Sequence, residues 1–203
     1  MINKLRVRNY KALHDVDIDF GPINVLIGPN DSGKTSLLDV VGALGRSVDK
    51  PLSAAFAGPW DGRSLVWLSD PDLNVKIEAD LGSEQQAIRY HLDCRFSPHG
   101  RSVILESEWF ETEGQRVEAS TRNHAATIVC QVAQQNPDVA ESLKTIARRI
   151  HHALRGVHTY RFNPRALALP VAPDSSRRFR MDVSGFGLAL CLDDILGYDR
   201  KLF

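Results

Sequence analysis

The sequence lacks any apolar run that approaches the ~20 residues needed to span a bilayer. Its first ten residues, MINKLRVRNY, alternate apolar and basic side chains and so lack the continuous apolar stretch of a signal peptide. Cysteine is also scarce: Cys94, Cys130 and Cys191 are far apart and odd in number, which argues against a disulfide framework or a CxxC metal site. We therefore expect a cytoplasmic protein whose cysteines are small buried hydrophobes.

Net charge is absent too, since 25 Lys and Arg balance 25 Asp and Glu, but the charges are unevenly placed. Residues 144–180 hold nine basic side chains and one acid, whereas residues 61–140 hold seven basic and thirteen acidic ones. A basic segment can follow a polyanion such as DNA or RNA, and a solvated helix face that balances the acidic region fits equally well. The candidate nucleic-acid contacts are Lys144, Arg148, Arg149, Arg155, Arg161, Arg165, Arg177, Arg178 and Arg180.

The first part of the chain changes its apolar pattern twice. Residues 2–20 alternate apolar with polar side chains, which predicts two antiparallel strands. The run INVLI at 23–27 is almost continuously apolar, as is typical of a strand buried on both faces in a mainly parallel sheet. After the next loop, apolar residues recur at helical spacing up to Gly45 and predict a helix closed by that glycine.

Residues 65–118 contain several alternating segments separated by turn signals, which predicts an antiparallel lobe. Its glutamates are interpreted as an exposed acidic face; they are Glu106, Glu108, Glu111 and Glu113. Asn136 and Pro137 predict the start of a helix over 137–155, in which adjacent His151 and His152 read as part of a solvated basic stripe. A strand is expected over 157–162, an irregular basic connection over 163–180, and a further helix from residue 183.

Residues 28–35, GPNDSGKT, match the pattern GxxxxGK[ST] between a predicted strand and a predicted helix. This context predicts a phosphate-binding loop, in which glycines allow the backbone to wrap a β-phosphate and the helix N-terminus faces its charge. Lys34 is expected at the β- and γ-phosphates, and the Thr35 hydroxyl on Mg²⁺. The predicted nucleotide contacts of the loop are Gly28, Pro29, Asn30, Asp31, Ser32, Gly33, Lys34, Thr35 and Ser36.

The segment RNYKALHDVDIDFGPINVLIGPNDSGKTSLLDVV resembles the N-terminal segment of SMC, RecF and OLD-type ATPases, over about the first 45 residues. The resemblance implies ATP and Mg²⁺ as cofactors and places Asn30 near the γ-phosphate. Asp31 departs from the usual glycine in a way that is similar to OLD-like sequences. Asn9 and Lys11 occupy positions that imply further nucleotide contacts, with simple edge-strand polarity as the alternative.

The resemblance implies an α/β P-loop NTPase fold, the N-terminal half of an ABC-type head with an antiparallel β-lobe and a helical arm. The expected parts are a P-loop unit at 1–45, the β-lobe at 65–118, a helical and basic segment at 121–180 and a helix at 182–203. The stretch LALCLDD at 188–194 looks like a Walker B strand, but its apolar stripe and its lack of a preceding helix favour an amphipathic helix. We therefore expect an incomplete domain that gains hydrolysis only with a signature and Walker B half.

Because a lone P-loop sheet exposes its edge, a homodimer or a completing chain is the expected partner. DNA repair or phage defence is the setting that the resemblance implies. Two alternatives remain open: a nucleotide-binding regulatory module without turnover, and a transporter-type ABC subunit. A GTPase is disfavoured, because a DxxG match at 182–185 has no NKxD motif to accompany it.

Overall fold

A computed structural model describes residues 1–58, 62–67, 73–82, 87–99, 102–119, 123–171 and 181–198. The chain forms two compact units, 1–157 and 158–203, and each is described by itself.

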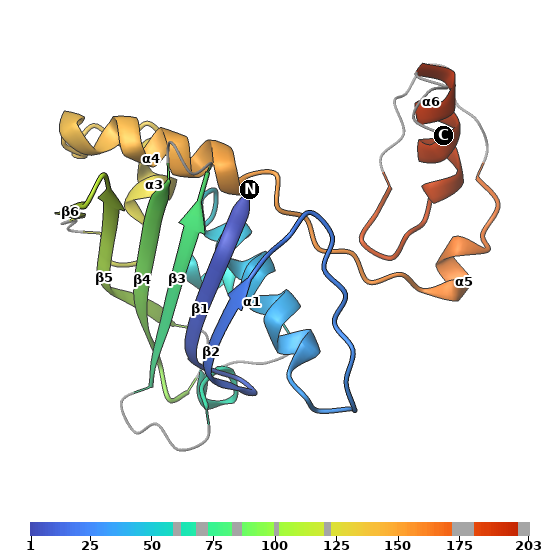
Figure 1. The fold of residues 1–203 in the computed structure, drawn as a ribbon, viewed down its shortest axis with the longest axis horizontal. Coiled ribbons are helices and arrows are strands. Elements are labelled where there is room, and N and C mark those ends of the chain that lie inside the picture. The colour runs from blue at the N-terminus through green and yellow to red at the C-terminus, as the bar shows by residue number, and fades with distance from the viewer. Residues whose placement is uncertain are drawn as a thin grey trace. The chain divides into compact units, whose positions relative to one another are not determined.

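The first unit is built on one six-stranded sheet in the order β2-β1-β3-β4-β5-β6 (Figure 1). Its strands are β1 (Ile2–Tyr10), β2 (Leu13–Asp19), β3 (Asn74–Leu81), β4 (Ile88–Phe96), β5 (Val103–Thr112) and β6 (Gln115–Glu118). Every strand pairing among the described residues is antiparallel. The predicted hairpin and the predicted antiparallel lobe are both confirmed, and the pairing of β1 with β3 joins them into a single sheet.

Helices cover one face of this sheet, as Figure 1 shows for α1 and α4. The helices of the first unit are α1 (Lys34–Ser47), α2 (Leu52–Ala55), η1 (Gly62–Leu65), α3 (Ile128–Ala133) and α4 (Glu141–Leu154). Helix α4 buries Leu143, Ala147, Ile150 and Leu154, a stripe at helical spacing that packs into the same core as the inward residues of the strands. The second unit holds α5 (Pro164–Leu167) and α6 (Leu188–Tyr198).

Element boundaries differ from the prediction where side chains bond to nearby backbone. The Asn136 side chain accepts a hydrogen bond from the Asp138 backbone at 3.0 Å, so this segment forms a turn, and α4 begins at Glu141 instead of residue 137. Asp182 likewise accepts from the backbone of Ser184 at 2.8 Å, and α6 begins only at Leu188. The predicted strand over 157–162 is wrong, because these residues form no strand ladder.

The predicted buried strand over 23–27 is also wrong. Residues 20–33 run as an extended connection from β2 to α1 (Figure 1), and none of the described strands pairs with them. Ile23, Val25 and Ile27 are 87%, 76% and 91% exposed. A strand forms only where a neighbour supplies backbone hydrogen bonds, so the apolar run is a strand sequence without a neighbouring strand.

A β-bulge changes the direction of one glutamate. The register of β4 against β5 shifts between Asp93 and Cys94, and an extra residue in one strand turns the following side chains to the other face. Glu108 is therefore 1% exposed, and its expected place on an exposed acidic face is wrong. Its carboxylate accepts hydrogen bonds from the Tyr90 hydroxyl at 2.8 Å and the Ile128 backbone N–H at 2.7 Å. Burial raises the pKa of Glu108 to about 7.

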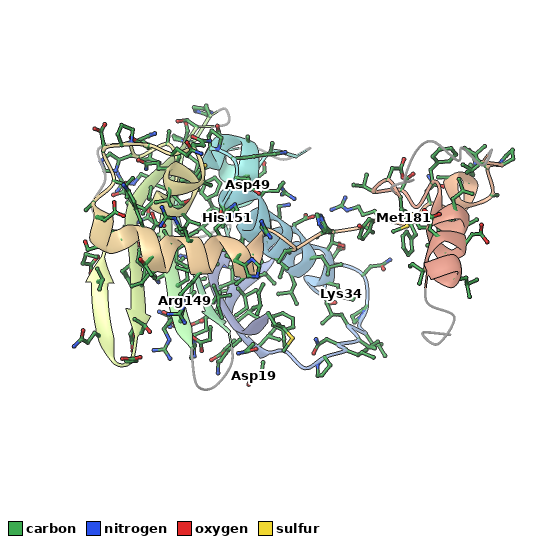
Figure 2. The ribbon with its side chains drawn as sticks, turned by 90° about the horizontal axis from the view of Figure 1, so that it is seen from above. Asp19, Lys34, Asp49, Arg149, His151 and Met181 are labelled. Atoms are coloured by element: carbon green, nitrogen blue, oxygen red, sulfur yellow. The ribbon has the colours of Figure 1, made fainter. Side chains whose placement is uncertain are left out.

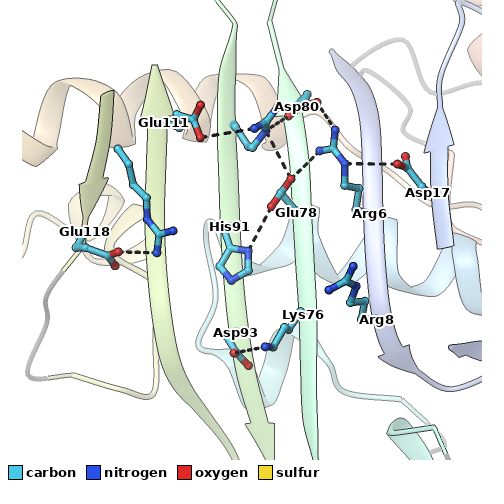
Figure 3. A network of polar contacts seen from close by, with 12 residues as sticks. Arg6, Arg8, Asp17, Lys76, Glu78, Asp80, His91, Asp93, Glu111 and Glu118 are labelled. Atoms are coloured by element: carbon cyan, nitrogen blue, oxygen red, sulfur yellow. Dashed lines mark hydrogen bonds and ion pairs between the residues drawn. The ribbon is translucent and has the colours of Figure 1, made fainter. Parts of the chain in front are cut away.

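The other face of the sheet is polar and crossed by ion pairs between strands (Figure 3). Arg6 of β1 meets Glu78 of β3 at 2.7 Å, and Arg89 of β4 meets Asp80 at 2.9 Å. His91 lies flat on Trp109, with ring centroids 4.6 Å apart, and burial lowers the pKa of His91 to about 4. This face is thus held together by cross-strand pairs.

A close approach connects the end of α1 to the end of the first unit. A Cβ atom on Gly45 would lie only 2.8 Å from the Cβ of Val157. Glycine is therefore the residue that lets the backbone of α1 lie directly against Val157.

Candidate nucleotide-binding site

The loop that precedes α1 has the backbone form that its glycines and aspartate allow. Gly33 has φ +87° and Asp31 has φ 64°, both in the left-handed region. Aspartate is one of the few side chains that tolerate this region, which explains how Asp31 stands where related loops carry glycine. A Cβ on Gly28 would lie 2.9 Å from the Ser32 hydroxyl, so a side chain there would intrude on the loop interior.

The Lys34 amine points back into this loop. Its Nζ donates hydrogen bonds to the carbonyl oxygens of Gly28 at 2.8 Å and Pro29 at 2.5 Å, and lies 3.1 Å from the Ser32 hydroxyl. Lys34 is labelled in Figure 2 at the start of α1. The loop thus closes around a single positive charge at the end of a helix.

The N-terminus of α1 is open to an anion. Gly33 is the N-cap residue and offers no side chain to bond the first backbone N–H groups, and the first turn carries no acid. Those N–H groups and the helix dipole favour negative charge at this position. Thr35 is exposed and Ser36 half-buried in the first turn. A hydroxyl there suits Mg²⁺, a hard cation that takes oxygen ligands and keeps several waters.

The turn between β1 and β2 lies against the loop. A Cβ on Gly33 would lie 3.1 Å from the Leu13 side chain and 3.8 Å from that of Ala12. Asn9 and Lys11 of this turn have φ values of 61° and 49°, an uncommon conformation for such residues. The turn is held by backbone bonds to the segment 65–67, from Lys11 N–H to Leu65 and from Trp67 N–H to Asn9.

Lys11 forms an ion pair with α1. Its Nζ lies 2.7 Å from Oδ2 of Asp39, and the two side chains are 14% and 23% exposed. The structure thus brings Lys11 to the helix that begins at the loop, and it adds Asp39, which sequence reasoning missed. The available signal was an acid within the apolar helical pattern of α1, one residue beyond two leucines.

The other predicted site residues separate into three groups. Lys144, Arg148, Arg149 and Arg155 belong to α4 and its C-terminal end. Arg161 and Arg165 belong to the second unit, and Arg177, Arg178 and Arg180 lie outside the described residues. Asp193 and Asp194 lie in α6, so the prediction that LALCLDD is helical is confirmed. Within the described ranges, no group of three or more His, Cys, Asp or Glu side chains could hold a metal ion.

A GK[ST] loop that leads from an extended segment into an uncapped helix is the arrangement of P-loop nucleoside triphosphatases. The chain belongs to the AAA ATPase domain family, which matches residues 1–150.

Two curated proteins resemble parts of the chain. The OLD nuclease of Thermus scotoductus is 39% identical over 41 residues, which are 20% of this chain and 8% of that protein. The DNA replication and repair protein RecF of Magnetococcus marinus is 34% identical over 65 residues, 29% of this chain and 17% of that protein. The matches therefore span less than a fifth of the length of these relatives. They confirm the resemblance to OLD-type and RecF ATPases.

A solved SMC ATPase structure, from work on ATP-driven dimerization and DNA-stimulated activation, overlaps the fold with a TM-score of 0.36 and 15% identity. The overlap covers 73% of this chain and 98% of that one. Among the helices of the described ranges, none is long and apolar enough to cross a membrane.

Proposed function

We propose that the chain binds ATP with Mg²⁺ at residues 28–36, as the first half of an ABC/SMC-like ATPase head. The observation that carries the proposal is the Lys34 amine enclosed by the carbonyls of Gly28 and Pro29 in front of the uncapped α1. A triphosphate at this position would meet the amine, the loop N–H groups and the helix dipole together. Thr35 would give a hydroxyl oxygen to Mg²⁺ bound between the phosphates. Lys11 and Asn9 approach from the β1–β2 turn.

The exposed segment 23–27 supports a completing partner. Burying a side chain such as Ile23, Val25 or Ile27 contributes roughly 1.5–3 kcal/mol each. A neighbouring strand would supply this burial together with the missing backbone hydrogen bonds. We propose that this strand comes with the half that carries the signature and Walker B sequences, from a completing chain or a second copy, and that hydrolysis requires it.

Nucleotide binding is tested with a fluorescent ATP analogue. Lys34→Met is expected to weaken binding at least about tenfold, because a charge-assisted contact to phosphate is lost. Thr35→Val should remove most of the dependence of affinity on Mg²⁺, because the hydroxyl ligand is gone. Lys50→Met, a change of the same charge at an exposed lysine after α1, is the control and should leave affinity unchanged. Equal affinity of the Lys34→Met variant and the unaltered protein would refute the proposal.

A DNA-associated setting, DNA repair or phage defence, is proposed from the resemblance to OLD nuclease and RecF. A second candidate is a nucleotide-binding module without turnover. It is favoured by the carboxylates near the site: Asp39 is paired with Lys11, and Asp193 and Asp194 belong to a helix of the second unit. ATP turnover by this chain alone that disappears in Lys34→Ala would rule out that second candidate and the need for a completing half.

A further inference from the structure

A groove of about 530 Å³ lies where α4 crosses the end of the sheet. Arg148, Arg149 and His152 of α4 line one side, and Met1, Leu81 and Ile88 line the other side and the floor. Figure 2 shows Arg149 on the side of α4 opposite to His151, which meets Asp49 at 2.7 Å. The groove is therefore separate from the P-loop and from the His151 contact.

The walls of the groove are fixed by the fold. The Gly82 N–H donates to the Met1 carbonyl at 3.1 Å, and the Asn3 side chain donates to the Gly82 carbonyl at 2.6 Å. On the other side, Ala147 and Ile150 are fully buried and anchor α4 to the core. The arginines thus project from a rigid helix over a rigid strand end, which lowers the entropy lost when a ligand is bound.

The charge of the groove has one sign among the residues that the structure describes. Its described lining contains two guanidinium groups and an imidazole, with no carboxylate. The recess on the polar face of the sheet is different, because there Arg8 lies 3.2 Å from Asp15 and Lys76 lies 3.6 Å from Asp93. Lys144, one turn earlier on α4, lies 2.7 Å from Glu141 and does not line the groove.

We propose that this groove binds the sugar–phosphate backbone of a single nucleic-acid strand, an inference that rests on the proposed DNA-associated function and gives it a location. Guanidinium groups match phosphate with paired N–H donors, and the apolar floor of Leu81 and Ile88 suits the sugars between phosphates. Arg148 and His152 are one helical turn apart, about 6 Å along the axis, a span of about two phosphates of a strand.

An extended acidic peptide fits the groove less well. A peptide that adds to a sheet edge needs free backbone groups there. The N–H and carbonyl of Gly82 are already bonded to Met1 and Asn3. The observations therefore favour phosphate recognition by side chains.

The test measures binding of a fluorescein-labelled 20-nucleotide thymidine strand by anisotropy, over roughly 50–200 mM salt. Arg148→Gln with Arg149→Gln should weaken binding at 50 mM salt at least about tenfold and reduce the salt slope by about 1.4, because each single-strand phosphate contact contributes about 0.7. The control, Lys50→Gln with Arg95→Gln, removes the same charge from exposed positions and should stay within about twofold. Melting temperatures of both double variants verify folding.

Three outcomes would overturn the assignment of the groove. They are no binding of the strand by the unaltered protein, an equal loss in the control variant, and binding of poly-glutamate but not of DNA that depends on the two arginines. The fluorescent ATP analogue should bind the groove variant normally. Failure of ATP binding in the unaltered protein would instead contradict the proposed nucleotide site while leaving the groove result intact.

Discussion

Replacing Glu108 tests whether the bulge of β5 has placed an ionisable group in the core. Two substitutions separate its packing from its charge. Glu108→Ala removes the partner of both the Tyr90 hydroxyl and the Ile128 N–H, which are buried donors. Glu108→Gln keeps the shape, because its amide oxygen can accept from Ile128 while its NH₂ donates to the Tyr90 oxygen.

The magnitudes follow from the contacts. A buried donor left without a partner costs about 1–3 kcal/mol, so Glu108→Ala should lower the free energy of unfolding by about 2–5 kcal/mol. Glu108→Gln should have a small effect at pH 5. The pKa of Glu108 rises from 4.5 to about 7, a gap of roughly 2.5 pH units at about 1.4 kcal/mol each, or about 3 kcal/mol.

The sign of the pH effect is fixed by the direction of this shift. Because the folded pKa lies above the unfolded one, the stabilising contribution of protonated Glu108 is complete below pH 4.5 and is lost as pH rises through 7. His91 acts in the opposite direction, because its pKa is lowered from 6.5 to about 4 and acidification through this range destabilises the fold. The two effects partly cancel in the unaltered protein.

The measurement is therefore a difference between proteins. Urea unfolding followed by tryptophan fluorescence gives the free energy of unfolding of the unaltered protein and of Glu108→Gln from pH 4.5 to 8. The His91 contribution is common to both and drops out. We expect the Glu108→Gln variant to gain about 3 kcal/mol relative to the unaltered protein across this range. Parallel pH profiles of the two proteins would show that Glu108 titrates as an ordinary exposed carboxyl, and the reasoning would be wrong.

Three further predictions concern the sheet and the nucleotide site. His91→Phe keeps a flat ring for stacking and should reduce the loss of stability between pH 6.5 and 4, measured by the same unfolding assay; an unchanged acid limb would contradict it. Asp39→Asn should lower stability by about 1–2 kcal/mol by leaving the Lys11 amine without its carboxylate, and adding Lys11→Met should cost less than the sum of the single changes; additive losses would show no coupling. Gly33→Ala should lower stability by about 1–2 kcal/mol and weaken binding of the ATP analogue because φ is +87°, whereas Gly156→Ala, at a glycine with open space, should be neutral in thermal melts.

The sequence predicted those elements whose pattern is local. The hairpin of β1 and β2, the antiparallel strands and the apolar stripe of α4 follow from alternation and helical spacing, which depend on neighbouring residues. The segment 23–27 has an equally clear pattern but no strand, because a pattern specifies which sides of a strand are apolar and cannot supply its neighbour. Glu108 was misplaced since a one-residue bulge leaves no mark in an alternating segment.

The loop at 28–35 shows the same division. Its glycine and lysine positions, and the helix that follows, could be predicted from the spacing of the motif. The Asp39 partner of Lys11 could not, because it depends on how the β1–β2 turn packs against α1. That packing is set by residues 65–67, which hold the turn from a distant part of the chain.

The contact between Gly45 and Val157 gives α1 the geometry of a pushrod. The helix has fourteen residues, about 21 Å at 1.5 Å per residue, with Lys34 at its first position and Gly45 near its last. Packed interiors resist compression, so an axial shift of α1 that begins at the loop is delivered almost undiminished to Val157. Val157 is the last residue of the first unit, and a side chain added at Gly45 would lengthen the rod at the point where it meets the outgoing chain.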